Sequence, residues 1–271
     1  MLGYHSLQFG VGGIESAYDA LLGSTLQADD LSAYVQHEIL RQPYVGDDIQ
    51  LTLDLDVQQR LADLLNGYRG AAVVLDAATG DVIAAVSLPT IDPNQLDTLW
   101  DALISDPRDP LYNRAFQAGY QPGGALQTML MTAALISNQP IDTVIEESDE
   151  AVTVNDVTLT CAEIPPASRL TLGEAYAYAC PAPFMQLYDA IGTERFQELY
   201  NLFRLDSPPV MSGFPLMPAD ATNNTFTYED ALGQGETTVT VAQMAAIAAA
   251  IVNGGNAPQP NLLHAIRSPD S

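Results

Sequence analysis

A small set of side chains in this sequence could carry out chemistry. Cys161 and Cys180 could form one disulfide bridge in an exported protein, although we favour two half-buried thiols that pack as small hydrophobic groups. No metal site is predicted, because no cysteine or carboxylate pair lies at ligand spacing from the three scattered histidines, His5, His37 and His264. The acidic run 146–150 lacks the oxygen spacing and the glycine of a calcium loop and is predicted to be a solvated loop.

Lysine is missing from this set. All 9 Lys+Arg residues are arginine, so no lysine amine of this chain can act as base, nucleophile or Schiff-base partner. The 34 Asp+Glu residues give a net charge of -25. Nucleic acid and anionic lipid surfaces are bound through clustered Lys and Arg, so the composition argues against both as partners.

Two further classes of segment are not predicted. The opening MLGYHSLQFG has neither a basic start nor an apolar core, so the sequence predicts no signal peptide. The longest apolar run, VAQMAAIAAAIV, is too short to span a bilayer, so no membrane segment is expected. With 271 residues and 47% hydrophobic content, the chain can form one large domain with an appendage.

The elements that position the candidate side chains follow from local patterns. Residues 1–48 look like an appendage, with GVGG as a plain turn before an amphipathic helix over 14–22. Alternation over 49–55 predicts a strand that passes into a helix near Asp56, a plausible N-cap. Two apolar runs around DAATGD predict a hairpin over 70–89.

The rest of the chain is predicted to be mostly helical. The helical segments are expected at 96–107, 125–138, 172–192 with an interruption at its prolines, 194–206 and 240–255. One hairpin makes an unstable sheet alone, so either the helices supply the core or further strands are missing.

In order along the chain, these segments resemble the transpeptidase domain of class B penicillin-binding proteins. LTLDLDVQQRL resembles the entry to that domain, and GAAVVLDAATGDVIAAVSLPTIDPN resembles its first hairpin. LYNRAFQAGYQPGG resembles the approach to the nucleophile, and LGQGETTVTVAQMAAIAAAIVNGG resembles a late block of the domain. The resemblance implies an α+β fold, an antiparallel sheet packed against helices with a helical subdomain. It assigns 1–48 to the end of a non-catalytic pedestal and 49–271 to a transpeptidase-like domain, incomplete at its C-terminus because it lacks the late strands.

The chemistry of that family rests on three signatures, and the resemblance places two of them here. The first, Ser-x-x-Lys at the start of a buried helix, has Gly124 and Gln127 at its serine and lysine positions. Glycine offers no nucleophile, and a neutral amide is no general base. The second, Ser-x-Asn, has Ala179 and Pro181 at its functional positions. The third, Lys-Thr-Gly, is not found before the sequence ends.

The resemblance also suggests a vestigial cleft and two substitute nucleophiles. The cleft would lie near these residues: Gly123, Gly124, Cys180, Gly233, Gln234 and Gly235. Thr128 is a weak substitute, since a helical threonine is expected to bond its own backbone. Cys180 occupies the middle of the second signature, where a cysteine is a packing residue in the family.

Taken together, the sequence predicts a noncatalytic scaffold or binding module in cell-wall assembly, without a cofactor. Its partners would be other cell-wall assembly proteins or the peptidoglycan stem peptide, on the outer face of the cytoplasmic membrane. The alternatives are a divergent β-lactam-binding D,D-transpeptidase or carboxypeptidase that uses another nucleophile, and a truncated gene product.

Overall fold

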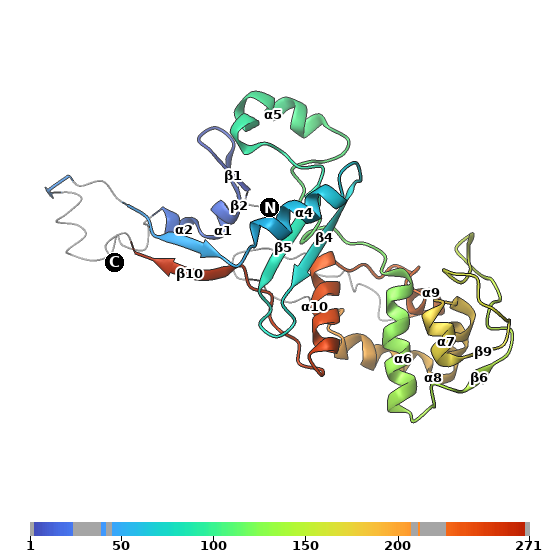
Figure 1. The fold of residues 1–271 in the computed structure, drawn as a ribbon. Coiled ribbons are helices and arrows are strands. Elements are labelled where there is room, and N and C mark those ends of the chain that lie inside the picture. The colour runs from blue at the N-terminus through green and yellow to red at the C-terminus, as the bar shows by residue number, and fades with distance from the viewer. Residues whose placement is uncertain (1–2, 24–38, 42–44, 207–210, 212–225, 269–271) are drawn as a thin grey trace. The chain divides into compact units, whose positions relative to one another are not determined.

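The structure is a computed structural model that describes residues 3–23, 39–41, 45–206, 211 and 226–268. His37 and part of the predicted 1–48 appendage lie outside these ranges. The chain divides into two compact units (Figure 1). The first comprises Met1–Ala118, Pro209–Met217 and Thr240–Ser271, and the second comprises Gly119–Pro208 and Pro218–Val239. The predicted boundary at residue 48 stays a prediction.

The first unit opens with a small hairpin that the sequence did not predict. Strand β1 (Gly3–Ser6) pairs antiparallel with β2 (Gly10–Gly13), so the predicted GVGG turn is wrong. A Cβ at position 12 would lie 2.8 Å from the ring of Tyr4, so a larger residue there would require this ring to shift. The predicted helix over 14–22 is two short helices, α1 (Ile14–Ala17) and α2 (Asp19–Leu22), which are separated at Tyr18.

The predicted strand, helix and hairpin that follow are confirmed with adjusted bounds. Strand β3 (Asp48–Leu51) precedes α4 (Leu55–Leu64). The N-cap is Asp54 rather than Asp56, because its carboxylate accepts the N–H groups of Asp56 (2.9 Å) and Val57 (3.1 Å). The hairpin consists of β4 (Gly70–Leu75) and β5 (Val82–Leu88) in antiparallel register.

A second strand pair in this unit uses the end of the described chain. Strand β10 (Leu263–Arg267) pairs antiparallel with β3. This pair reaches β5 through the Thr52 hydroxyl, which donates to the Val82 carbonyl at 2.8 Å, and through Val82 N–H, which donates to Asn261 at 2.8 Å. Helix α10 (Val241–Val252) packs against β4, as Figure 1 shows. Short η3 (Pro93–Gln95) and α5 (Leu96–Ser105) follow β5.

A shared hydrophobic core joins these elements of the first unit. Its buried members are Ile14, Tyr18, Val82, Ala85, Ala115, Phe116, Met211, Ala242 and Leu262. They come from the N-terminal helices, the hairpin, the segment after α5 and α10, together with Met211 and Leu262. The helices therefore supply much of the core that a two-stranded sheet could not form alone.

The second unit is mainly helical. Short η4 (Gly123–Leu126) leads into α6 (Gln127–Ile136), which packs against α7 (Leu172–Ala177) and α8 (Pro181–Leu202). Two short antiparallel pairs were not predicted, β6 (Val144–Ile145) with β9 (Leu170–Thr171), and β7 (Val152–Val154) with β8 (Val157–Leu159). Helix α9 (Tyr228–Ala231) completes the unit.

The predicted interruption of 172–192 at its prolines is confirmed, because α7 ends at Ala177 and α8 begins at Pro181. The prolines at 181 and 183 lie in the first turn of α8, where a missing N–H costs nothing. A second break, where the stretch 172–192 was expected to end, falls at Gly192, whose φ of 75° is not helical. In the predicted solvated loop 146–150, Ser148 is fully buried and donates to the Ile145 carbonyl at 2.6 Å.

Candidate functional site

The predicted cleft residues from the two glycine-rich segments lie together in the second unit. Gly123 N–H donates to the Gly233 carbonyl at 3.0 Å. Both glycines adopt left-handed backbone conformations, with φ of 57° and 68°. A Cβ at Gly233 would lie 2.3 Å from the Gly123 oxygen and 2.4 Å from its nitrogen, so only glycine fits this approach.

Hydrogen bonds hold the 233–235 loop beside the segment before η4. The Gln121 side-chain amide donates to the Gly235 carbonyl at 2.9 Å and to the Gln234 carbonyl at 3.2 Å. From the other side, the buried Asp230 carboxylate accepts the Thr237 hydroxyl at 3.3 Å. The structure thus brings Gly123 and the 233–235 loop together, and their role as a cleft stays a prediction.

Positions 124 and 127 face each other across one helical turn. A Cβ added to Gly124 would meet the Gln127 amide nitrogen at 3.8 Å, which is ordinary van der Waals contact. The Gln127 side chain is only 4% exposed, and among the described residues its amide makes no hydrogen bond. The space for a serine beside a buried residue 127 is therefore present, although neither a hydroxyl nor a basic group occupies it.

The segment 179–181 forms a tight connection between α7 and α8. Ala179 has a φ of 49°, and its N–H donates to the Tyr176 carbonyl at 3.0 Å. Cys180 is the N-cap residue of α8, and Pro181 is its first residue. No described contact joins these three residues to Gly123 or Gly124, so the inclusion of Cys180 in the cleft stays a prediction.

Both substitute nucleophiles are engaged in other interactions. Cys180 is fully buried and forms a disulfide with Cys161, so our preference for two thiols was wrong. The pairing follows from the fold, because Ala162 N–H donates to the Tyr178 carbonyl at 2.9 Å and brings the two segments together. The Thr128 hydroxyl contacts the Tyr176 hydroxyl at 2.7 Å instead of its own backbone, and Thr132 is the residue that bonds back, to the Thr128 carbonyl.

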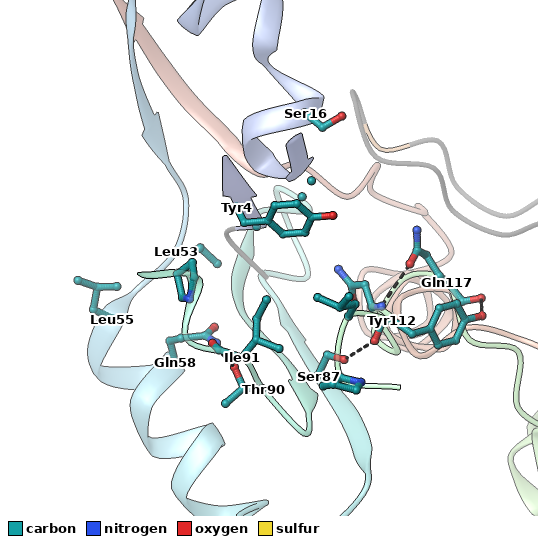
Figure 2. Close-up of a pocket in the computed structure, with 17 residues that line it drawn as sticks. Tyr4, Ser16, Leu53, Leu55, Gln58, Ser87, Thr90, Ile91, Tyr112 and Gln117 are labelled. Atoms are coloured by element: carbon teal, nitrogen blue, oxygen red, sulfur yellow. Dashed lines mark hydrogen bonds between the residues drawn. The ribbon is translucent and has the colours of Figure 1, made fainter. Parts of the chain in front are cut away.

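The first unit contains a cavity that no sequence motif indicated. Its volume is about 530 Å³, and it lies between the N-terminal segment and the stretches 87–93 and 110–117 (Figure 2). Tyr4, Ser16, Asn113 and Gln117 are among the lining residues. The lining residues are distant from one another in sequence, which is why no local pattern revealed them.

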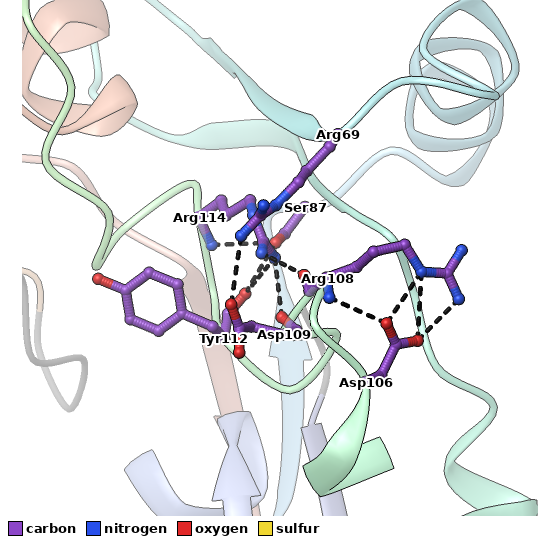
Figure 3. A network of polar contacts seen from close by, with 7 residues as sticks. All are labelled: Arg69, Ser87, Asp106, Arg108, Asp109, Tyr112 and Arg114. Carbon is purple, nitrogen blue, oxygen red and sulfur yellow. Dashed lines mark hydrogen bonds and ion pairs between the residues drawn. The ribbon is translucent and has the colours of Figure 1, made fainter. Parts of the chain in front are cut away.

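A second feature that the sequence did not reveal is the buried Arg114, which is 3% exposed (Figure 3). Its guanidinium donates to three backbone carbonyls, those of Asp109 (2.9 Å), Tyr112 (3.3 Å) and Arg108. The backbone N–H of Arg114 donates to the Ser87 hydroxyl at 2.9 Å, and that hydroxyl donates to the Tyr112 carbonyl at 3.2 Å. Arg114 therefore fixes the loop that forms one side of the cavity.

The outer part of the same loop carries an ion pair between Arg108 and Asp106. From this pair we predict how the stability of the chain changes at acid pH. Hydrogen bonds from the Arg108 side chain and N–H lower the pKa of Asp106 to about 2. Because this pKa is below the value of about 3.9 in the unfolded chain, the stabilisation is present above pH ~4 and is lost as the pH falls towards 2. We expect Asp106→Asn to make the slope of melting temperature against pH shallower between pH 4 and 2.

A matched variant separates this effect from general acid unfolding. Asp101→Asn changes an exposed carboxylate on α5, outside the loop, and should leave that slope as it is in the parent chain. Equal slopes for Asp106→Asn and the parent chain would show that the ion pair adds nothing to stability.

Comparison with known proteins identifies the fold. The model of the penicillin binding protein transpeptidase domain matches residues 70–270. Penicillin-binding protein A from M. tuberculosis, solved as an imipenem acyl-enzyme complex, superposes with a TM-score of 0.85 at 25% identity and covers 99% of this chain and 66% of that one. The D,D-transpeptidase domain of an Eggerthella lenta peptidoglycan glycosyltransferase gives a TM-score of 0.79 at 24% identity, over 99% of this chain and 65% of that one.

Curated relatives agree with the structural matches. Peptidoglycan D,D-transpeptidase PbpA of Mycolicibacterium smegmatis is 31% identical over 99% of this chain, which spans 58% of that relative's length. Peptidoglycan D,D-transpeptidase MrdA of Escherichia coli K12 is 38% identical over 45% of this chain and 21% of its own length. These matches confirm the predicted fold of antiparallel strand pairs and helices. The chain belongs to the penicillin binding protein transpeptidase domain family.

Proposed function

We propose that this chain is a noncatalytic transpeptidase-like domain that acts by binding within cell-wall assembly. The observation that carries the proposal is the pair Gly124 and Gln127, which face each other at the start of α6 where the family signature has serine and lysine. In this chain the two positions carry a hydrogen atom and a neutral amide in place of a hydroxyl and an amine.

The chemistry of acyl transfer supports this assignment. A serine attacks only when a base takes its proton, and a carboxamide cannot accept that proton near neutral pH. No lysine exists elsewhere in these 271 residues to take over. Ala179 and Pro181, at the positions of the second signature, carry no side-chain group that could relay a proton or hold a substrate amide.

The binding role is argued from what the site retains. The tight contact between Gly123 and Gly233 and the amide of Gln121 keep the 233–235 loop in place. We propose that this cleft holds a stem peptide without cleaving it, or that the domain contacts other cell-wall assembly proteins. A location outside the cytoplasmic membrane agrees with the Cys161–Cys180 disulfide, because such bridges persist in oxidising compartments. Among the described residues, no helix has the length and apolar character to cross a membrane.

The direct test is reaction with a β-lactam. The purified chain would be incubated with imipenem or penicillin G and its intact mass measured. We expect no covalent adduct, in contrast to penicillin-binding protein A from M. tuberculosis, which is known as acyl-enzyme complexes with both compounds. A stoichiometric adduct would overturn the proposal, and peptide mapping would then locate the nucleophile.

Restoring the first signature alone should not restore the reaction. Position 124 has room for the Cβ of a serine, whereas Gln127→Lys puts an amine at a buried position, so circular dichroism must first show that Gly124→Ser with Gln127→Lys is folded. We nevertheless expect no acyl adduct, because Ala179 and Pro181 still lack the groups of the second signature. The measurement is intact mass after β-lactam treatment, with Gly124→Ala plus Gln127→Lys as the matched control without a hydroxyl. An adduct on the serine variant only would show that the site has decayed less than we propose.

A further inference from the structure

The sequence contains two Asn–Gly pairs, Asn66–Gly67 and Asn253–Gly254, and each follows the C-terminus of a helix. An asparagine before a glycine can cyclise, because the glycine nitrogen is not shielded by a Cβ atom and can reach the side-chain carbonyl carbon. The reaction needs an asparagine side chain that is free to rotate, an amide nitrogen that no hydrogen bond holds, and access to water. The two pairs differ in these conditions.

Asn66 and Gly67 meet all three conditions. Both are exposed, in the turn between α4 and β4 (Figure 1). Among the residues that the structure describes, neither the Asn66 side chain nor the Gly67 N–H makes a hydrogen bond. Gly67 has a φ of 88°, and a Cβ built there would meet nothing within 4 Å apart from its chain neighbours. The Gly67 nitrogen is therefore accessible to the side chain that precedes it.

The second pair is held in place by hydrogen bonds. The Asn253 side-chain amide donates to the Asn256 carbonyl at 3.1 Å, and the Asn256 amide donates to the Asn253 carbonyl at 3.2 Å. Rotation of the Asn253 side chain towards the Gly254 nitrogen would break the first of these bonds, which raises the barrier to cyclisation. The same dipeptide thus occurs once free and once tethered in this chain.

We propose that Asn66 is a site of spontaneous deamidation. The Gly67 nitrogen attacks the Asn66 side-chain carbonyl carbon, and a new C–N bond forms as the bond to the amide nitrogen breaks. That nitrogen leaves as ammonia with the proton that the Gly67 nitrogen loses. Water then opens the cyclic imide at either carbonyl and leaves aspartate or isoaspartate at position 66. The reaction consumes only water and does not involve the site near Gly124.

The product would weaken the end of α4. It places a carboxylate beyond the helix C-terminus, where the helix dipole disfavours negative charge and Asp63 already lies in the last turn. Helix α4 holds β5 through Gln58, whose amide donates to the Ala85 carbonyl at 2.8 Å and accepts the Ala85 N–H at 2.9 Å. We therefore expect the melting temperature to fall as position 66 becomes modified.

The test is incubation of the purified chain at mildly alkaline pH, followed by peptide mapping with mass spectrometry and enzymatic methylation of isoaspartate. We expect position 66 to be modified about tenfold faster than position 253, a ratio that corresponds to a barrier difference of about 1.4 kcal/mol. In concentrated urea the fold no longer distinguishes the two pairs, so their rates should agree within about twofold.

Two matched variants locate the effect. Gly67→Ala adds a methyl group beside the attacking nitrogen in open space and should slow the modification of Asn66 about tenfold. Gly254→Ala makes the same change in the other pair and should leave the Asn66 rate unchanged. Circular dichroism would confirm that both variants are folded.

Three results would overturn the proposal. The first is equal rates at positions 66 and 253 in the folded chain. The second is an Asn66 rate that Gly67→Ala does not lower. The third is a difference between the two positions that persists in urea, because the fold would then not be its cause.

Discussion

Arg114→Met is expected to lower the free energy of unfolding by about 4 kcal/mol, because a buried charged donor would be lost while its acceptors stay behind. The guanidinium is 3% exposed and donates to the carbonyls of Asp109, Tyr112 and Arg108. Methionine retains much of the apolar stem but offers no donor. The three carbonyls of the loop would therefore lose the hydrogen bonds that the guanidinium donates to them. Urea denaturation followed by circular dichroism measures the change.

Arg108→Met is the matched control for this prediction. The Arg108 side chain is 66% exposed and pairs with Asp106, and only its backbone carbonyl contacts Arg114. This variant removes the Asp106–Arg108 ion pair, which is partly exposed, so its urea midpoint should fall only slightly and much less than that of Arg114→Met. If both variants unfolded at the same midpoint, the buried hydrogen bonds of Arg114 would not be what stabilises the loop.

The contrast between these arginines shows which parts of the fold were predictable. The hairpin β4–β5 and helix α10 were predicted because their apolar periodicity is local in the sequence. The role of Arg114 was not predicted, because its acceptors are backbone carbonyls. Every residue has such a carbonyl, so the amino-acid types do not show which ones will lie near the guanidinium. The pairing of β3 with β10 was not predicted for a related reason. The two short strands are separated by over two hundred residues, and neither sequence pattern indicates which strand is its partner.

The candidate site was predicted in part, for equally physical reasons. Glycines at 123 and 233 stood out within motifs, and the structure brings their backbones together. The disulfide was missed because two cysteines alone do not reveal whether their segments meet. The cavity of the first unit was missed too, because Tyr4, Ser16 and Gln117 come together only after the hairpin and loops have folded.

The proposed binding role depends on the backbone of the site. A noncatalytic domain still needs the η4–α6 start and the 233–235 loop in place if it binds through this surface, whereas the hydroxyl and the amine are needed only for chemistry. The proposed binding role thus predicts that backbone contacts at the site are energetically important. Gly233 is the position where this can be measured.

Gly233→Ala is expected to lower the free energy of unfolding by about 4 kcal/mol, of which about 1 kcal/mol is the cost of a left-handed alanine. The remainder comes from the methyl group, which would lie 2.3 Å and 2.4 Å from the Gly123 oxygen and nitrogen. Backbone atoms cannot swing aside as a flexible side chain can, so the Gly123 N–H to Gly233 carbonyl bond must stretch or break.

The comparison that isolates the contact is Gly254→Ala. Gly254 has nearly the same φ, 64° against 68°, and a Cβ there would meet nothing within 4 Å. It should cost only about 1 kcal/mol, the backbone term alone. Urea denaturation of both variants gives the difference, and hydrogen exchange of the Gly123 amide reports whether the contact opens. Equal losses for the two variants, with the Gly123 amide still protected, would mean that the close approach of the two glycines does not hold the site together.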